Sequence, residues 1–319
     1  MRVSVVSRIA SLIPAVQREL GRYPALSGVE LVALAPEDCV ATNEAWAKES
    51  SVVLADPGCV AGGPLEACGS LVWMQSTWAG VNALAGGRRD FRCTKLSGCF
   101  GPLIAEHVFA HVLRRERRVD ELRAAQAATT WAHADFAATA RPLRSLTLGV
   151  LGAGDIGQHV AGVAKAFGMR TVAYARDGEA RRNFDAALPD VEAVLGESDV
   201  LVSALPSTPE TRGLLDDRLG RCAAKRPLFV NVGRGDVVSE DAVCEALDRG
   251  HLAEAVLDVF ATEPLPADSR LWSHPAVRVT PHVAALSLPS DVAAVFCANL
   301  DRFLRDDDLL YPVDWGKGY

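Results

Sequence analysis

The sequence predicts an α/β protein in which helices cover both faces of a parallel, doubly wound sheet. Short apolar runs recur along the chain and alternate with helix-like segments, which is the pattern of β-α-β units. A glycine-rich turn joins one of these runs to a helix pattern. The length of 319 residues suits two domains of ordinary size better than one.

The first hundred residues predict a small α/β unit. Short apolar runs alternate there with helical patterns, and each run has the length of a strand. These runs are Val3–Val6, Leu31–Leu34, Val52–Leu54 and Leu71–Met74. A long helix is predicted next, from Pro102 to about Ala128, because proline suits the first turn of a helix and apolar residues follow at helical spacing.

The most regular part of the chain predicts the larger sheet. Near-continuous apolar strands separated by helices are typical of a parallel sheet that is buried on both faces. After Pro289 one more amphipathic helix is predicted, to about Phe303. The strand candidates are Leu146–Leu151, Thr171–Ala175, Val200–Leu205, Leu228–Val232, Ala255–Val259 and Val277–Thr280.

Charge and hydropathy argue against several classes of protein. The net charge of −7 lacks the basic footprint of a nucleic-acid-binding protein. No stretch approaches the roughly 20 apolar residues of a membrane helix. The start of the chain lacks the charged segment, long apolar core and cleavage site of a signal peptide. We therefore expect a cytoplasmic protein that binds neither nucleic acid nor a membrane.

The glycine-rich turn lies between the first strand candidate of the larger sheet and a helix pattern. Gly152 permits a tight turn, Gly154 lets the backbone approach a pyrophosphate, and Gly157 lets the helix pack close to the strand. The N–H groups at the helix N-terminus would bind the phosphates. The turn predicts a Rossmann-type dinucleotide-binding domain, and a glycine-rich turn without a ligand is the alternative. The turn residues expected at the cofactor are Gly152, Gly154, Asp155, Ile156 and Gly157.

The end of the next strand bears on which dinucleotide binds. An acidic residue about 20 positions after the glycine turn would bind the ribose 2′-hydroxyl of NAD(H). This sequence has Ala175 there, followed by Arg176, which can pair with the 2′-phosphate of NADP(H). We therefore expect NADP(H) to be preferred. NAD(H) stays possible, because Asp177 could return a carboxylate to the ribose. Arg181 and Arg182 could add positive charge at the phosphate, and two solvated side chains are the alternative.

Arg234, Glu263 and His282 follow three successive strand candidates, and Asp258 lies near the end of the second. The carboxyl ends of parallel strands meet at one edge, where such sheets bind their ligands. Each residue has an ordinary structural alternative, such as a turn glutamate or a surface arginine. Their convergence on one edge favours a functional set.

This set suits the reduction of a 2-keto acid to a 2-hydroxy acid. The reaction needs a hydride donor, a proton donor for the developing alkoxide and a cation for the carboxylate. Arg234 offers a planar, bidentate donor, and His282 can donate a proton near neutral pH. Glu263 can hold the imidazole ring and favour its protonated form. Asp258 could contact the cofactor carboxamide or support Arg234.

One further pair of histidines has a spacing that metal sites use. His107 and His111 lie four residues apart in the predicted long helix, as helical zinc ligands do. No third ligand is apparent in the sequence. We therefore expect packing or polar roles for both histidines and no bound metal.

Five stretches match the motifs of a known family in both order and spacing: Leu151–Gly157 (LGAGDIG), Leu205–Thr211 (LPSTPET), Asn231–Val238 (NVGRGDVV), Leu257–Leu265 (LDVFATEPL) and Val279–Ala285 (VTPHVAA). With them, the chain resembles the D-isomer-specific 2-hydroxyacid dehydrogenase family from about Leu71 to Leu286. The residues around His282 and the C-terminal Gly318-Tyr319 are most like the glyoxylate/hydroxypyruvate reductase branch.

The resemblance implies a site. It assigns Arg234, Glu263 and His282 as the catalytic set, with His282 as the acid/base. The segment from Trp73 to Asn82 resembles the family's substrate loop, in which backbone N–H groups hold the substrate carboxylate. The resemblance then gives the cofactor Leu205, Pro206, Thr211, Val232, Gly233, Asp258 and His282, and the substrate Trp78, Ala79, Gly80, Arg234 and His282.

The resemblance also implies an organisation. Residues 99–286 would form the dinucleotide-binding domain, and 1–98 with 287–319 a smaller flavodoxin-like substrate domain across a cleft. The long helix near Leu103–Ala128 often builds a dimer in the family, so a homodimer is expected. Asn82 departs from the usual aspartate, as Ala175-Arg176 departs from the NAD-type acid. Candidates to narrow the substrate pocket are Trp78, Trp131 and Trp272.

The leading hypothesis is an enzyme that uses NADPH to reduce glyoxylate, hydroxypyruvate or a similar small keto acid to the D-2-hydroxy acid. A dehydrogenase of another small acid, phosphoglycerate-, formate- or phosphite-like, is a second hypothesis. A non-catalytic regulator that senses the dinucleotide is a third, and it belongs to a different class.

Overall fold

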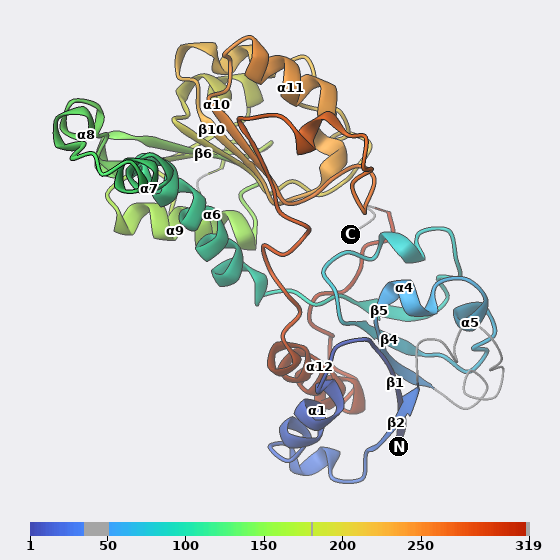
Figure 1. Cartoon of the computed structure of the whole chain (residues 1–319). Coiled ribbons are helices and arrows are strands. Elements are labelled where there is room, and N and C mark those ends of the chain that lie inside the picture. The colour runs from blue at the N-terminus through green and yellow to red at the C-terminus, as the bar shows by residue number, and fades with distance from the viewer. Residues whose placement is uncertain (35–50, 180, 317–319) are drawn as a thin grey trace. The chain divides into compact units, whose positions relative to one another are not determined.

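The computed structural model describes residues 1–34, 51–179 and 181–316. The chain divides into two compact units (Figure 1). Unit 1 contains Met1–Cys99 and Ser287–Tyr319, and unit 2 contains Phe100–Leu286. These limits lie within one residue of the boundaries expected from the sequence. The functions assigned to the two domains stay predictions.

Unit 2 contains a parallel sheet of seven strands in the order β12-β11-β10-β9-β6-β7-β8. The order reverses beside β6, which confirms the predicted Rossmann-type sheet. The strand candidates fall on strands, with ends displaced by up to two residues. The strands are β6 (Thr147–Leu151), β7 (Arg170–Tyr174), β8 (Ala186–Leu188), β9 (Val200–Ser203), β10 (Leu228–Asn231), β11 (Glu254–Leu257) and β12 (Val277–Val279).

Helices cover both faces of this sheet, with α6 and α9 on one face and α10 and α11 on the other (Figure 1). The central strands β6, β9 and β10 are buried along their whole length, which explains their near-continuous apolar sequence. The helices are α6 (Phe100–Glu116), α7 (Val119–Ala127), α8 (His133–Thr139), α9 (Asp155–Ala166), α10 (Val191–Glu197) and α11 (Glu240–Asp248).

The single helix predicted from Pro102 to about Ala128 is wrong, because the chain breaks between α6 and α7. Arg118 has φ +50°, in the left-handed region, and α7 begins after it. Glu116, the last residue of α6, is 4% exposed and accepts a hydrogen bond from Arg141 at 2.6 Å. This pairing joins residues 25 positions apart, so no local pattern could reveal it.

Unit 1 contains a parallel sheet of five strands in the order β2-β1-β3-β4-β5, which confirms the predicted flavodoxin-like fold. The short strands β5 and β8 are absent from the prediction, because three residues carry too little periodicity. Its strands are β1 (Arg2–Val6), β2 (Glu30–Leu34), β3 (Val52–Ala55), β4 (Trp73–Ser76) and β5 (Arg92–Thr94). Its helices are α1 (Leu12–Leu20), α4 (Pro57–Val60), α5 (Gly63–Glu66) and α12 (Pro289–Leu304).

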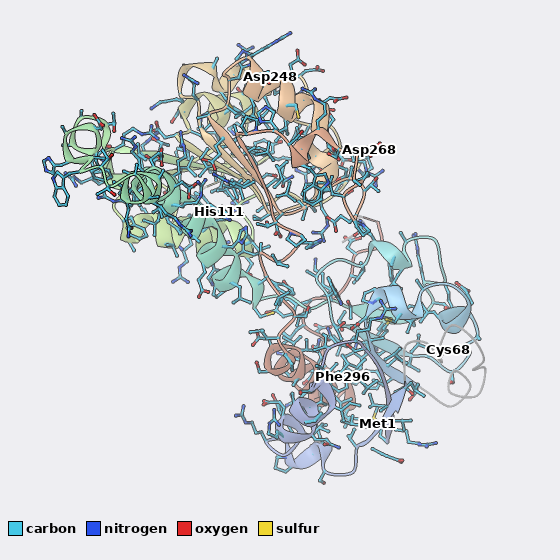
Figure 2. The ribbon with its side chains drawn as sticks, viewed as in Figure 1. Met1, Cys68, His111, Asp248, Asp268 and Phe296 are labelled. Atoms are coloured by element: carbon cyan, nitrogen blue, oxygen red, sulfur yellow. The ribbon has the colours of Figure 1, made fainter. Side chains whose placement is uncertain are left out.

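The last helix, α12, returns to unit 1 and packs beside α1 (Figure 1). It carries Phe296, which is labelled in Figure 2 and stacks on Trp73 of β4 with ring centroids 5.7 Å apart. Phe303 stacks on the same ring at 5.2 Å. Aromatic stacking of this kind adds to the burial of apolar area. The helix predicted after Pro289 is thus confirmed.

Short 3-10 helices complete the described chain: η1 (Pro24–Leu26), η2 (Asn82–Leu84), η3 (Leu143–Ser145), η4 (Leu219–Ala224), η5 (Gly235–Val237) and η6 (Arg270–Trp272). Among the described residues, none of the helices is long and apolar enough to cross a membrane.

A buried amide ties α12 to the sheet and to the C-terminal segment. Asn299 is fully buried, and its Nδ2 donates to Gln75 Oε1 at 2.9 Å and to the Leu310 carbonyl at 3.1 Å. Its Oδ1 accepts the Leu310 N–H at 2.7 Å. Thr94 of β5 donates to the same Gln75 oxygen at 2.8 Å. Every polar atom of the Asn299 amide is therefore used.

We predict that Asn299→Leu lowers the free energy of unfolding by about 2–4 kcal/mol, because the Leu310 N–H and carbonyl and the Gln75 oxygen lose their buried partner. Ala294→Leu, at an exposed position of the same helix, is the control and should change stability by less than about 0.5 kcal/mol. Urea denaturation measures both variants. Equal stability of Asn299→Leu and wild type would contradict the prediction.

Candidate functional site

The turn after β6 has the geometry expected of the glycine-rich turn. Gly152 has φ +103°, a conformation that side chains other than glycine rarely adopt. A Cβ at Gly157 would lie 2.1 Å from the Gly152 carbonyl oxygen, so only glycine allows this close contact. A Cβ at Gly154 would meet nothing within 4 Å, so the backbone there is open to a ligand.

Helix α9 presents its N-terminus at this turn. Gly154 is the N-cap residue, and no side chain caps the first N–H groups. Asp155 and Ile156 form the first helical residues. Uncapped N–H groups and the positive end of the helix dipole favour a phosphate at this position. The turn and the helix together therefore fit the pyrophosphate of a dinucleotide.

After β7, Arg176 is exposed, whereas the residues on either side of it are buried or bonded within the turn. Ala175 is 8% exposed and its N–H donates to a β8 carbonyl at 3.0 Å, whereas Arg176 is exposed. Asp177 accepts the Glu179 N–H at 3.0 Å and pairs with Arg181. These two interactions, the backbone N–H first, hold the pKa of Asp177 below its usual value. The carboxylate that could have reached the ribose is thus held within its own turn.

The loop after β9 is cross-linked by hydroxyl groups. Thr211 Oγ1 donates to the Pro206 carbonyl at 2.6 Å and accepts the Thr208 N–H at 2.8 Å. Ser207 Oγ donates to Asp236 Oδ2 at 2.5 Å, which joins this loop to the turn after β10. Sequence reasoning missed the Ser207–Asp236 pair, because its members are 29 residues apart and neither lies in a distinctive local pattern.

His282 and Glu263 form the pair that the sequence predicts. His282 Nδ1 lies 2.7 Å from Glu263 Oε2, and Glu263 Oε1 accepts the Phe260 N–H at 2.9 Å. The His282 side chain is 40% exposed, so its Nε2 can face a ligand. Its φ of +54° is uncommon for a residue with a side chain, and such strain clusters at functional sites.

Asp258 holds the loop that carries His282. Its Oδ1 accepts the Thr280 hydroxyl at 2.6 Å and the Val283 N–H at 2.9 Å, and its Oδ2 accepts the Ala284 N–H at 3.0 Å. Its carbonyl oxygen also accepts the His282 N–H at 2.9 Å. The sequence suggested that Asp258 could support Arg234, and this suggestion is corrected. The Asp258 carboxylate is 1% exposed and is bonded to the residues around His282 instead.

Arg234 follows Val232 and Gly233, which are buried at the end of β10. Its Nη1 donates to the Gly233 carbonyl at 2.7 Å, and within the described residues the rest of the guanidinium has no hydrogen-bond partner. Burial lowers the pKa of Arg234, and the nearby carboxylates of Glu263 and Asp236 oppose that shift. A largely buried cation with unused donors is suited to bind an anionic ligand.

The Arg234 loop is fixed by a side chain that sequence reasoning missed. Asn231 is 1% exposed, and its Nδ2 donates to the Arg234 carbonyl at 3.0 Å. Its Oδ1 accepts the Gly233 N–H at 3.2 Å. Its place directly before the Gly-Arg-Gly turn was the available signal, because asparagine commonly bonds the backbone two or three residues on.

The predicted substrate loop belongs to unit 1. Trp78 is 46% exposed, and its carbonyl accepts the Leu96 N–H at 3.1 Å. The N–H groups of Ala79 and Gly80 donate to no other residue in the described ranges. Two successive unused N–H groups provide donors for an anion.

His107 and His111 are half-buried in α6, and their rings lie 4.8 Å apart (His111 is labelled in Figure 2). His107 Nε2 and His111 Nδ1 are buried without a hydrogen-bond partner. Burial lowers the pKa of His111 to about 4, and His107, Arg114 and Arg278 add to that shift. The described residues contain no group of three or more side chains placed to hold a metal ion.

The family model and the similar proteins of known function all indicate the same family. The family model for the NAD-binding domain of D-isomer-specific 2-hydroxyacid dehydrogenases matches residues 109–284. A glyoxylate/hydroxypyruvate reductase A from Serratia proteamaculans is 36% identical over 61% of this chain and 62% of its own length, so the match spans less than two thirds of that relative. Its counterpart from Escherichia fergusonii is 32% identical over 69% of this chain and 70% of its own length.

Solved structures match the whole chain. A D-isomer-specific 2-hydroxyacid dehydrogenase family protein from Aeromonas salmonicida has a TM-score of 0.83 and 34% identity over 98% of this chain and 99% of its own. A Xanthobacter autotrophicus enzyme in complex with NADPH and MES has a TM-score of 0.83 and 30% identity over 99% of both chains. The NADPH-dependent glyoxylate/hydroxypyruvate reductase from Sinorhizobium meliloti, in complex with NADP and sulfate, has a TM-score of 0.81 and 26% identity over 100% and 99%.

We predict that acid destabilises the protein partly through His111. Its folded pKa of about 4 lies below the unfolded value, so the unfolded state binds more protons as the pH falls from about 6.5 to about 4. Stability is therefore lost on acidification through this window. Partial exposure screens the charge, so the expected loss is about 1–2 kcal/mol.

Unfolding by urea at several pH values measures this loss. His111→Leu should flatten the decline between pH 6.5 and 4, because leucine cannot take up a proton. His133→Leu, at an exposed position of α8, is the matched control and should keep the wild-type slope. A slope that His111→Leu leaves unchanged would sink the prediction.

Proposed function

The chain belongs to the D-isomer-specific 2-hydroxyacid dehydrogenase family, and we propose that it reduces a small 2-keto acid to the D-2-hydroxy acid with a nicotinamide dinucleotide. The observation that carries this proposal is the 2.7 Å contact between His282 and Glu263, on the same unit as Arg234 and the glycine-rich turn. The names of two relatives favour glyoxylate or hydroxypyruvate as the substrate.

In this proposal His282 is the acid. Its Nε2 donates a proton to the carbonyl oxygen of the keto acid, while Glu263 pairs with Nδ1 and holds the ring in one orientation. The Phe260 N–H keeps Glu263 in place. The dinucleotide supplies the hydride when it is bound. The acid therefore has a fixed orientation before the substrate arrives.

Each unit offers its own donors for a substrate carboxylate in this proposal. The Arg234 guanidinium is partly buried and has unused donors, and partial burial strengthens a charge-assisted hydrogen bond. The N–H groups of Ala79 and Gly80 add two further donors.

NADP(H) is the proposed cofactor, with NAD(H) possible. The glycine-rich turn and α9 would hold the pyrophosphate, and Arg176 would pair with the 2′-phosphate. Asp177 is neutralised by Arg181, so it does not oppose that phosphate. Two of the similar structures contain NADPH or NADP.

The homodimer and the cytoplasmic location expected from the sequence stay proposals. The homodimer is supported by exposed apolar side chains on and beyond α7. Val119, Leu122 and Trp131 are 47%, 42% and 91% exposed, and an apolar surface of this kind is often covered by a partner.

We predict that His282→Ala lowers kcat for glyoxylate with NADPH by about 10²–10⁴-fold, because the reaction loses its proton donor. The Kd for NADPH should change by less than about threefold. His274→Ala is the control, because His274 also lies beside a carboxylate, 3.3 Å from Asp248 Oδ1. It should retain wild-type turnover. Steady-state kinetics measure all three proteins, and wild-type kcat in His282→Ala would refute the assignment.

We predict that Arg176→Ala lowers kcat/KM with NADPH by about 10–100-fold and leaves NADH almost unaffected, since a charge-assisted hydrogen bond is lost. Arg170→Ala is the control, because Arg170 is an exposed arginine at the other end of the same strand. Initial rates with both cofactors measure the ratio. A wild-type preference for NADH would overturn the cofactor proposal.

A further inference from the structure

A buried carboxylate lies at the carboxyl edge of the sheet in unit 1. Asp56 directly follows β3 and is 6% exposed. Its Oδ1 accepts the Ser7 hydroxyl at 2.6 Å and the Thr77 hydroxyl at 2.5 Å. Its Oδ2 accepts the Arg8 N–H at 2.8 Å. Burying a charge is costly unless hydrogen bonds compensate for the lost water. The three donors provide that compensation for the Asp56 carboxylate.

The Asp56 carboxylate does not cap the helix that follows it. Asp56 is the N-cap residue of α4, where an aspartate commonly accepts an N–H from the first helical turn. The side chain makes no such bond here. Its acceptor capacity is used instead by residues from two other loops, 49 and 21 positions away in the sequence.

Asp56 lies at the point where the direction of the sheet reverses. In the order β2-β1-β3-β4-β5, the chain leaves β1 toward one side and β3 toward the other. Such a switch point opens a crevice at the carboxyl ends of the two strands, and ligands of α/β sheets bind in these crevices. Asp56 is bonded to the loop after β1 and to the loop after β4, so it links loops from the two sides of this switch point.

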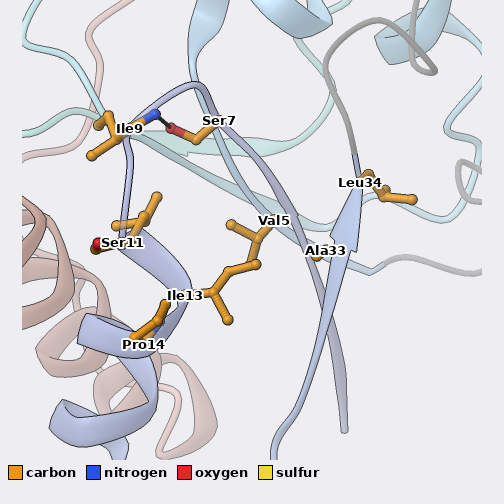
Figure 3. A pocket seen from close by; sticks show the side chains of 9 residues that line it. Val5, Ser7, Ile9, Ser11, Ile13, Pro14, Ala33 and Leu34 are labelled. Carbon is orange, nitrogen blue, oxygen red and sulfur yellow. Dashed lines mark hydrogen bonds between the residues drawn. The ribbon is translucent and has the colours of Figure 1, made fainter.

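The loop after β1 is itself ordered by Ser7, whose hydroxyl oxygen accepts the Ile9 N–H at 3.1 Å (Figure 3). It also lines a pocket of about 390 Å³ beside α1 and β2. The Asp56 carboxylate is therefore anchored on one side by a loop with its own internal bond. On the other side, the carboxylate is bonded to the Thr77 hydroxyl.

Thr77 begins the segment that carries the unused N–H groups. Its backbone N–H donates to the Ala55 carbonyl at 3.0 Å, and its hydroxyl is bonded to Asp56. Ala79 and Gly80 follow within three residues. We infer that Asp56 is a positioning residue that, through Thr77, orients the Ala79 and Gly80 N–H groups toward the carboxylate of the keto acid. The inference rests on the proposed function, which assigns that carboxylate to these two N–H groups.

The physical consequence is an anion site that is ordered before the substrate binds. When a loop becomes ordered only on binding, the free-energy cost of ordering it is subtracted from the binding free energy. Loss of the Asp56–Thr77 hydrogen bond should therefore weaken substrate binding. The reacting groups of unit 2 are untouched by this change. The expected signature is therefore a higher KM with an unchanged kcat.

Thr77→Val tests the inference, because valine keeps the shape of threonine and removes only the hydroxyl. We expect the KM for glyoxylate to rise about tenfold, with kcat and the Kd for NADPH within twofold of wild type. Thr77→Ser restores the hydroxyl and should restore the KM. Asp56→Asn, which cannot accept from all three donors, should raise the KM in the same way.

Thr94→Val is the matched control. It also removes a buried threonine hydroxyl from unit 1, one that donates to Gln75 and accepts from Trp73. It should lower stability without raising the KM. An equal rise of KM in Thr94→Val and Thr77→Val would overturn the inference, as would a wild-type KM in Thr77→Val.

Hydrogen exchange separates this inference from the proposed function. In Thr77→Val, exchange of the two hydrogen-bonded amides of this segment, the N–H groups of Thr77 and Trp78, should accelerate at least tenfold, and Thr77→Ser should match wild type. Unchanged exchange in Thr77→Val would also overturn the inference. If the wild-type protein reduced no keto acid, the proposed function would fail, and the exchange pattern would still decide whether Asp56 positions this segment.

Discussion

The parallel register of the sheet in unit 2 is the constraint on which its candidate site depends. All seven strands run in one direction, so their carboxyl ends and the loops that follow them lie at one edge. The glycine-rich turn, Arg234, Glu263 and His282 leave four different strands at that edge. The loops also approach one another closely: a Cβ at Gly235 would lie 1.9 Å from the Phe260 carbonyl carbon, so the turn after β10 can touch the loop after β11 only without a side chain.

Buried carboxylates play the same structural role in both units. Asp258 follows β11 and binds N–H groups of the loop after β12, and Asp56 follows β3 and binds groups from the loops after β1 and β4. Both are less than 10% exposed, and both accept mainly from neutral donors. A carboxylate at a strand end can accept several hydrogen bonds at once, which lets one residue fix a neighbouring loop. These loops carry His282 and the Ala79–Gly80 segment.

The charged residues divide into those that stabilise the fold and those that are left for ligands. Glu116 and Arg141 pair at the end of α6, and Asp177 and Arg181 pair within one turn. Arg234 has no ion pair within the described residues, although burial acts against its charge. Glu263 and Asp236 offset part of the cost of burying this cation, but neither forms an ion pair with it. A bound anion would remove that cost, which is why the guanidinium marks the candidate site more clearly than the exposed arginines do.

The sequence by itself determined six of the seven strands of the larger sheet, the glycine-rich turn and the residues at the strand ends. Each of these follows from a local pattern of apolar residues, of glycines or of polar residues that end a strand. The tertiary structure alone decided where α6 ends, that β5 and β8 exist, and that Asp258 binds the His282 loop rather than Arg234. It also decided that Asp56 binds Ser7 and Thr77 instead of capping α4. The physical reason is distance along the chain: these contacts join residues about 20 to 50 positions apart, and their energies depend on burial that exists only after the chain has folded.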